Sequence, residues 1–272
     1  YLQSTNISQS TNVYKNLNLT KVRDLPLTDV TANVILVSNA NTDQILYQKN
    51  SDLKVPTAST AKLMTALVAL DLYKSDDVIK VPYSCTTIDA TNVGLVAGTE
   101  YSFLNLMHAL LLNSGADAAC TISNGKTTNT QFIQLMNNKS KQLQMGNTNF
   151  TNSIGLDGPN GSNYSTANDL YLLSKESMKN DIIKNIVNQK QYVIKSMDDT
   201  FVHILKNTNE LLWENENSAG VKTGETAAAG EVLIYQYQEP ISNKSINIIV
   251  VQSLNRFNDT KSLLNWTLGS FE

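Results

Sequence analysis

The sequence Lys54-Val55-Pro56-Thr57-Ala58-Ser59-Thr60-Ala61-Lys62-Leu63-Met64-Thr65 joins a serine and a lysine to the start of an apolar helix. Apolar residues then recur at helical spacing, at Leu63, Leu67 and Leu70. Pro56 and Thr57 are typical of a helix start. Ser59 and Lys62 are therefore predicted to lie in the first turn of this helix, on one face and within reach of each other.

This spacing suits nucleophilic catalysis. Burial of Lys62 destabilises its charged form, so that part of the population can accept a proton from the Ser59 hydroxyl. The same helix end offers backbone N–H groups to a developing oxyanion. A Ser-x-x-Lys string is common by chance, so it indicates catalysis only when a second motif follows it in the right order.

That second motif is Lys222-Thr223-Gly224-Glu225-Thr226, which precedes a β-rich run. Beside the serine on an edge strand, Lys222 supplies a positive charge and Thr223 a hydroxyl donor for a substrate carboxylate. Gly224 allows close approach of the backbone, and the Glu225 N–H is the second oxyanion donor. Standing alone, the motif is interpreted as a solvated lysine beside a turn glycine.

A third candidate is Ser114-Gly115-Ala116-Asp117, after an apolar helix. Ser114 opposite Lys62 can relay a proton between nucleophile and leaving group, although a lone Ser-Gly after a helix is interpreted as a C-terminal turn. His108 and His203 are assigned structural roles. The sequence contains no metal-binding or phosphate-binding motif, so neither a metal nor a cofactor is predicted.

Composition excludes several classes of protein. The net charge is −3 and the pI is near 5.5, which argues against nucleic acid as a partner. No apolar run approaches the length of a transmembrane helix. Cys85 and Cys120 are interpreted as two small core side chains, with a disulfide as the alternative.

The order of elements predicts an α+β fold with an antiparallel sheet flanked by helices and a mostly helical lobe at about residues 80–160. Residues 1–25 are predicted to be a poorly ordered leader, and residues 26–272 a single catalytic domain. The expected strands are 34–37, 44–47, 192–194, 232–235 and 246–251. The expected helices after the first are 101–113, 131–143, 163–180 and 259–268.

From about residue 32 to residue 268, the chain resembles the low-molecular-mass penicillin-binding proteins of the serine D-Ala-D-Ala carboxypeptidase family. The resemblance rests on the quoted motifs and on four further segments of the sequence. These are Val34–Tyr47, Phe150–Asp157, Tyr164–Leu170 and Asn207–Leu212. It implies the penicillin-binding/serine β-lactamase-like fold.

The resemblance also implies a mechanism and a setting. Ser59 attacks the D-Ala-D-Ala carbonyl of a peptidoglycan stem peptide, Lys62 is the base and Ser114 relays the proton. Lys222 and Thr223 hold the terminal carboxylate, and the substrate-binding segment continues from Gly224 to Thr226. β-Lactam antibiotics acylate the same serine, and the expected location is extracytoplasmic, either secreted or associated with the wall or membrane.

One departure matters. The family's second motif reads Ser-x-Asn, and here Ala116 stands at the third position. An asparagine would bind the substrate amide and help to hold the lysine, so a weakened enzyme is expected unless Asp117 or a water substitutes. The alternatives are therefore a catalytically impaired penicillin- or peptidoglycan-binding module and, less favoured, a β-lactamase, which needs a deacylating glutamate in the interval where Glu176 and Glu210 lie.

Overall fold

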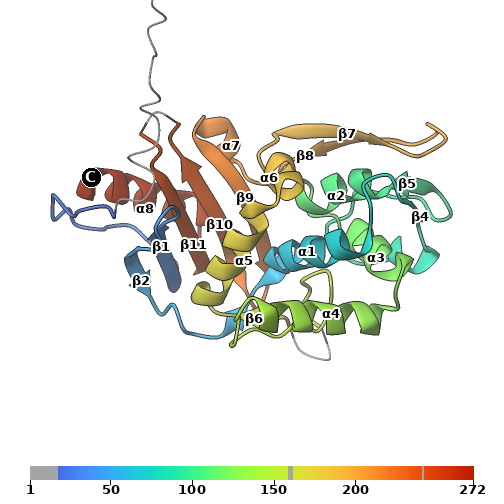
Figure 1. Ribbon diagram of the computed structural model, residues 1–272, viewed down its shortest axis with the longest axis horizontal. Helices are drawn as coiled ribbons and strands as arrows, with labels where there is room; N and C mark the ends of the chain where they lie inside the picture. The colour runs from blue at the N-terminus through green and yellow to red at the C-terminus, as the bar shows by residue number, and fades with distance from the viewer. Residues whose placement is uncertain (1–17, 159–161, 241) are drawn as a thin grey trace, which may run out of the picture.

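A computed structural model describes residues 18–158, 162–240 and 242–272. In this part, five strands form an antiparallel sheet in the order β2-β1-β11-β10-β9, with helices on both faces (Figure 1). The strands are β1 Val34–Asn39, β2 Ile45–Lys49, β9 Ser218–Thr226, β10 Gly230–Gln238 and β11 Ser245–Ser253. The motif of Lys222 lies on β9, at one edge of the sheet.

Alternation of side chains explains why both faces of the sheet are covered. Val34 and Leu36 of β1 belong to a core cluster shared with the helical lobe. Ile35 and Val37 of the same strand point the other way, into a cluster with α8. Because successive strand residues face opposite sides, a strand that is apolar throughout must be buried between two layers.

The helical lobe packs on one face of the sheet and beside it (Figure 1). The helices and 3₁₀ turns are η1 Ala58–Ala61, α1 Lys62–Leu72, η2 Tyr83–Cys85, α2 Phe103–Leu111, α3 Ala116–Gly125, α4 Asn129–Gln142, α5 Ala167–Lys179, α6 Asp181–Val187, α7 Leu211–Glu214 and α8 Arg256–Ser270. Short strand pairs complete it: β3 Val55–Pro56 with β6 Tyr164–Ser165, β4 Val78–Lys80 with β5 Glu100–Ser102, and β7 Gln191–Lys195 with β8 Val202–Lys206. The α+β class with a helical lobe is confirmed.

Two predicted helix starts are wrong. The helix expected from Asn163 begins at Ala167, because Tyr164–Ser165 pairs with β3 and the Thr166 hydroxyl caps the helix by accepting from Asp169 N. The nucleophile helix begins at Lys62, and Ser59 lies in the 3₁₀ turn before it. The tighter turn keeps the serine and the lysine adjacent.

The predicted leader lies only partly within the described residues, since 1–17 are outside them. Residues 18–25 lie against the C-terminal helix: Thr20 N donates to Glu272 O at 2.7 Å, and Trp266 Nε1 donates to Leu25 O at 2.9 Å. In the described part of the chain, no helix is both long and apolar enough to cross a membrane.

Candidate active site

Ser59 lies in a tightly held turn between β3 and α1. Thr57 N donates to Asn163 O at 3.2 Å, and Thr60 Oγ1 donates to Thr57 O at 2.6 Å. Ala58 has a φ of 46°, in the left-handed region that residues with a Cβ rarely adopt. Strain of this kind persists only where the surroundings impose it, which is common at functional sites.

Lys62 is the partner of the serine. Its Nζ donates to Ser59 Oγ at 2.8 Å, and the side chain is only 1% exposed. Burial lowers the pKa of Lys62 to about 7, against an opposing effect of the negative charge of Asp117. Near neutral pH, much of the population therefore carries the neutral amine that can accept a proton.

The second partner of Lys62 is a backbone carbonyl from the loop before α5. Lys62 Nζ donates to Ile154 O at 2.6 Å. The neighbouring carbonyl, Ser153 O, accepts from Thr65 Oγ1 at 2.6 Å, so the loop is fastened to α1 at two points. Asn152 Oδ1 orders the loop by accepting from the next backbone N–H groups, including Gly155 N at 2.7 Å.

Gly155 lets this loop lie against the nucleophile turn. Its φ is 89°, and a Cβ there would lie 2.1 Å from Ala58 O and 2.9 Å from Ser59 N. Any other residue would push the loop away from the serine. Residues 150–157 are one of the segments that carry the family resemblance, but the sequence alone assigns no role to them.

β9 closes the site from the other side. A Cβ at Gly224 would lie 3.0 Å from both the Ala58 Cβ and Ser59 N, so glycine is what lets the strand approach the nucleophile. Thr226 Oγ1 accepts from Ala229 N at 3.1 Å in the turn that follows. The Glu225 side chain is exposed and pairs with Arg256 at 3.1 Å.

Lys222 is buried in β9, with 1% of its surface exposed, and its Nζ donates to Thr223 O at 3.0 Å. Its pKa is held well below the usual range, first by burial and then by repulsion from Lys62 and Arg256. Thr223 Oγ1 shares a 2.5 Å hydrogen bond with Thr208 Oγ1. The site thus brings together two buried lysines and a threonine hydroxyl, all of which are groups that can donate a hydrogen bond to a bound molecule.

Ser114 lies between α2 and α3 with a φ of 60°. Its hydroxyl is buried, and within the described part of the chain it has no hydrogen-bond partner. It therefore makes no direct bond to Ser59 or Lys62. An unsatisfied buried hydroxyl is costly.

In the described part of the chain, the Asp117 side chain forms no hydrogen bond to Lys62 or Ser59. Its carboxylate accepts from Val93 N at 3.1 Å, from Gly94 N at 2.9 Å and from Leu95 N at 3.0 Å. The side chain is committed to that loop, and Ala116 itself is fully buried at the start of α3. Lys62 Nζ donates instead to Ile154 O and Ser59 Oγ.

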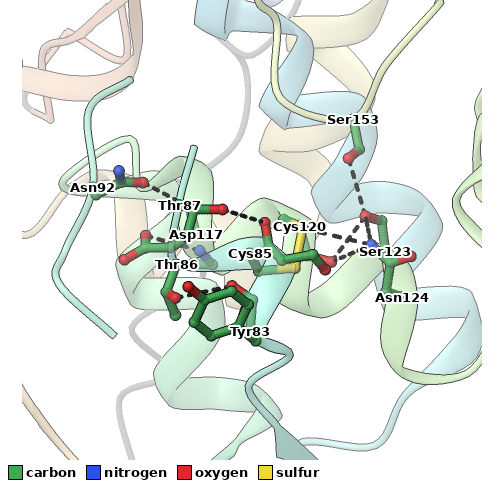
Figure 2. The surroundings of a disulfide bond; sticks show 12 residues. Tyr83, Cys85, Thr86, Thr87, Asn92, Asp117, Cys120, Ser123, Asn124 and Ser153 are labelled. Carbon is green, nitrogen blue, oxygen red and sulfur yellow. Dashed lines mark hydrogen bonds between the residues drawn. A yellow bond between two sulfur atoms is a disulfide. The ribbon is translucent and has the colours of Figure 1, made fainter. Parts of the chain in front are cut away.

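The preferred interpretation of the cysteines as separate core side chains is wrong. Cys85 and Cys120 form a disulfide, which joins η2 to α3 (Figure 2). One turn along α3, Ser123 Oγ accepts from Ser153 Oγ at 3.1 Å. The bridged helix therefore contacts the loop that holds Lys62.

The two glutamates considered for the β-lactamase alternative make no hydrogen bond to Ser59 or Lys62 in the described part of the chain. Glu176 pairs with Lys179 at 2.9 Å on the surface of α5. Glu210 is exposed at the start of α7. The functional contacts that sequence reasoning missed are Ile154 and Thr208, the first because a carbonyl leaves no mark in the side-chain pattern.

Comparison with known proteins gives consistent results. The profile described as D-alanyl-D-alanine carboxypeptidase matches residues 20–254. A D-alanyl-D-alanine carboxypeptidase of Mycobacterium tuberculosis is 31% identical over 210 residues, which covers 77% of this chain and 72% of that protein.

Solved structures give the same result. A crystal structure of a D-alanyl-D-alanine carboxypeptidase from Mycobacterium tuberculosis has a TM-score of 0.84 at 27% identity, covering 92% of this chain and 95% of that one. The Streptomyces K15 DD-transpeptidase has a TM-score of 0.82 at 26% identity, covering 89% and 98%.

Proposed function

The chain belongs to the D-alanyl-D-alanine carboxypeptidase family, and from this premise we propose that Ser59 is its nucleophile and a peptidoglycan stem peptide its substrate. Enzymes of this family work through a serine acyl-enzyme. The observation that carries the assignment is the 2.8 Å contact between Ser59 Oγ and a lysine whose pKa is about 7.

In the first step, Ser59 Oγ attacks the carbonyl carbon of the penultimate D-alanine. A neutral Lys62 accepts the hydroxyl proton through its lone pair while one of its own N–H groups still donates to Ile154 O. The backbone N–H groups of Ser59 and Glu225 receive the oxyanion.

In the second step, the C–N bond breaks and the leaving nitrogen must gain a proton. Ser114 is proposed to pass it from the Lys62 ammonium, since its buried hydroxyl has no partner among the described residues. D-Alanine departs as the amine. Water then attacks the ester, with Lys62 again as base, and releases the shortened peptide and Ser59.

Lys222 and Thr223 are proposed to hold the terminal carboxylate. The pKa of Lys222 is lowered by burial beside other cations. An entering carboxylate supplies the missing counter-charge and raises that pKa again. Lys222 therefore holds its proton most firmly when the substrate is bound, and this coupling favours substrates with a free C-terminus.

Ala116 argues for a slower enzyme. Removing one oxyanion-hole donor costs about 10²–10³-fold in kcat at other sites, and here the Asp117 carboxylate accepts from the backbone of residues 93–95 instead. Lys62 nevertheless keeps two hydrogen-bond partners and a lowered pKa. We therefore favour a working but weakened carboxypeptidase over a module that only binds.

The same site is proposed to open β-lactams, because their ring carbonyl stands where the scissile carbonyl would. The leaving amine stays tethered to the acyl group and hinders the entry of water. The Cys85–Cys120 disulfide supports an extracytoplasmic location, since such bonds persist in oxidising compartments.

The proposal is tested by intact-mass measurement after incubation with benzylpenicillin, together with D-alanine release from a stem pentapeptide. Wild type is expected to gain one adduct and to release D-alanine. Ser59→Ala is expected to do neither, and Ser84→Ala, at an exposed serine of η2, is expected to behave as wild type.

Labelling of Ser59→Ala would refute the assignment. An adduct without any D-alanine release would favour the binding module, and fast repeated hydrolysis of penicillin would favour a β-lactamase.

A further inference from the structure

Two segments that are far apart in the sequence lie directly against the nucleophile turn. A Cβ at Gly155 would lie 2.1 Å from Ala58 O, and a Cβ at Gly224 would lie 3.0 Å from the Ala58 Cβ. The same two Cβ positions would be 2.9 Å and 3.0 Å from Ser59 N. The proposed nucleophile therefore lies between the loop of Gly155 and the strand of Gly224.

The side chain of Asp157 joins these two segments a second time. Asp157 Oδ2 accepts from Ala228 N at 3.1 Å, across a separation of 71 residues. Asp157 follows Gly155 closely in the loop, and Ala228 lies in the turn between β9 and β10. The hydrogen bond thus closes a ring of contacts, which runs from the nucleophile turn through Gly155, Asp157, Ala228 and Gly224 and back to the turn.

The Asp157 side chain closes the ring as a charged group. Ser162 Oγ donates to its other oxygen, Oδ1, at 2.7 Å. Partial burial raises the pKa of this carboxyl, but hydrogen bonds from Ser162, from Ala228 N and from the Thr226 hydroxyl outweigh that effect and hold the pKa below its usual value. At neutral pH the acceptor is therefore a carboxylate, which binds an N–H group more strongly than a neutral oxygen does.

Closure of the ring explains how a strained turn is kept in place. Ala58 has a φ of 46°, and a residue with a Cβ remains in this region only where its surroundings impose it. Gly155 lies against the Ala58 carbonyl and Gly224 against the Ala58 Cβ, so the ring contacts this residue from both segments. The peptide group that follows Ala58 carries the Ser59 N–H, and Gly224 directly precedes Glu225. Both proposed oxyanion donors are therefore attached to the ring.

We propose that Asp157 is a positioning residue, which holds the N–H groups of Ser59 and Glu225 at the separation that an oxyanion requires. This inference rests on the proposed function. Asp157 acts through the two segments that it joins, namely the loop that binds Lys62 through Ile154 O and the end of the edge strand. Without this link the two segments separate, Ala58 relaxes, and the Ser59 N–H turns away from the oxyanion.

The test compares D-alanine release from a stem pentapeptide by three variants and the wild type. Asp157→Ala is expected to lower kcat about tenfold, the order expected for one charge-assisted hydrogen bond. KM should change little, because the oxyanion contacts strengthen only in the transition state. Asp157→Asn should retain most of kcat, because its amide oxygen accepts from Ala228 N while its NH2 group donates to Ser162 Oγ.

Ser162→Ala is the matched control, because it removes the second partner of Asp157 and leaves the ring closed. Its kcat is expected to stay near that of the wild type. Titration of Ser59 with benzylpenicillin gives the competent fraction of each variant, so every kcat is expressed per active site. A variant that is only less stable then shows a smaller competent fraction and an unchanged kcat.

Two results would overturn the positioning role. The first is an Asp157→Ala variant with the kcat of the wild type. The second is an equal loss of kcat in Asp157→Ala and Asp157→Asn, which would mean that the charge and not the link is what matters. Failure of the proposed function looks different, since the wild type itself then releases no D-alanine and forms no penicillin adduct on Ser59.

Discussion

The pH dependence of acylation tests the role of Lys62 most directly. The neutral amine is the reactive form, so the rate follows the fraction of Lys62 without its proton. With a pKa of about 7, that fraction is about a tenth at pH 6, about a half at pH 7 and about nine tenths at pH 8. Acylation by benzylpenicillin is therefore expected to rise about tenfold from pH 6 to pH 8 and then to level off.

A lysine with an ordinary pKa gives a different curve. Its neutral fraction would rise about a hundredfold over the same interval and would continue to rise beyond pH 9. The second-order rate of adduct formation, measured by intact mass from pH 5.5 to 9.5 at sub-saturating penicillin, reports the free enzyme. A slope of about tenfold per pH unit that continues beyond pH 9 would refute the argument from burial.

Replacing Asp117 tests the same argument, because it should change the pKa of Lys62 without removing the lysine. The negative charge of Asp117 raises that pKa against the effect of burial. Asp117→Asn is therefore expected to move the midpoint to lower pH, whereas Asp89→Asn, at an exposed carboxylate, should leave it unchanged. A midpoint that rises in Asp117→Asn would mean that loosening of the loop it holds outweighs the loss of charge.

Three further outcomes are expected. Lys62→Met should abolish acylation yet raise the free energy of unfolding at pH 7 by about 1–3 kcal/mol. The amine of Lys62 binds its proton more tightly in the unfolded chain than in the folded one, so the free energy of unfolding of the wild type should rise from about pH 7 toward pH 10.5. Urea titrations that show no such rise would contradict this expectation. Gly224→Ala should slow acylation about 10–100-fold with unchanged circular dichroism, because the added Cβ crowds Ser59; a wild-type rate would be the contrary result. Replacing Cys85 and Cys120 with alanine should lower the free energy of unfolding by about 2–5 kcal/mol, and equal urea midpoints would show that the disulfide is not stabilising.

Much of the fold could be predicted because its signals are local. Runs of branched apolar residues mark β1, β10 and β11, and the Ser59–Lys62 contact follows from spacing within one turn. The predicted start of α5 was wrong because Tyr164–Ser165 pairs as a strand with β3, which is distant in sequence. Tertiary pairing overrides a local capping signal there.

The site was predictable only where side chains carry the chemistry. Ile154 acts through its carbonyl, 92 residues from Lys62, so its identity says nothing about the contact. The spacing of Cys85 and Cys120 does not reveal whether they meet. The contact between Thr208 and Thr223 joins the chain before α7 to the edge strand, and it is visible only after the sheet has formed.

The position of β9 at the edge of the sheet also bears on which chains can enter. An open strand edge invites any extended polypeptide to pair with it, including a second copy of the same protein. Here α6 packs against the beginning of β9 at Gly220, and the nucleophile turn lies across it at Gly224. Residues 220 and 224 are four apart on the strand, so both contacts are made on one face of the sheet and do not cover its hydrogen-bonding edge. An extended peptide that pairs with this edge is expected to run past the nucleophile turn at Gly224, so the edge strand can position a substrate through its backbone.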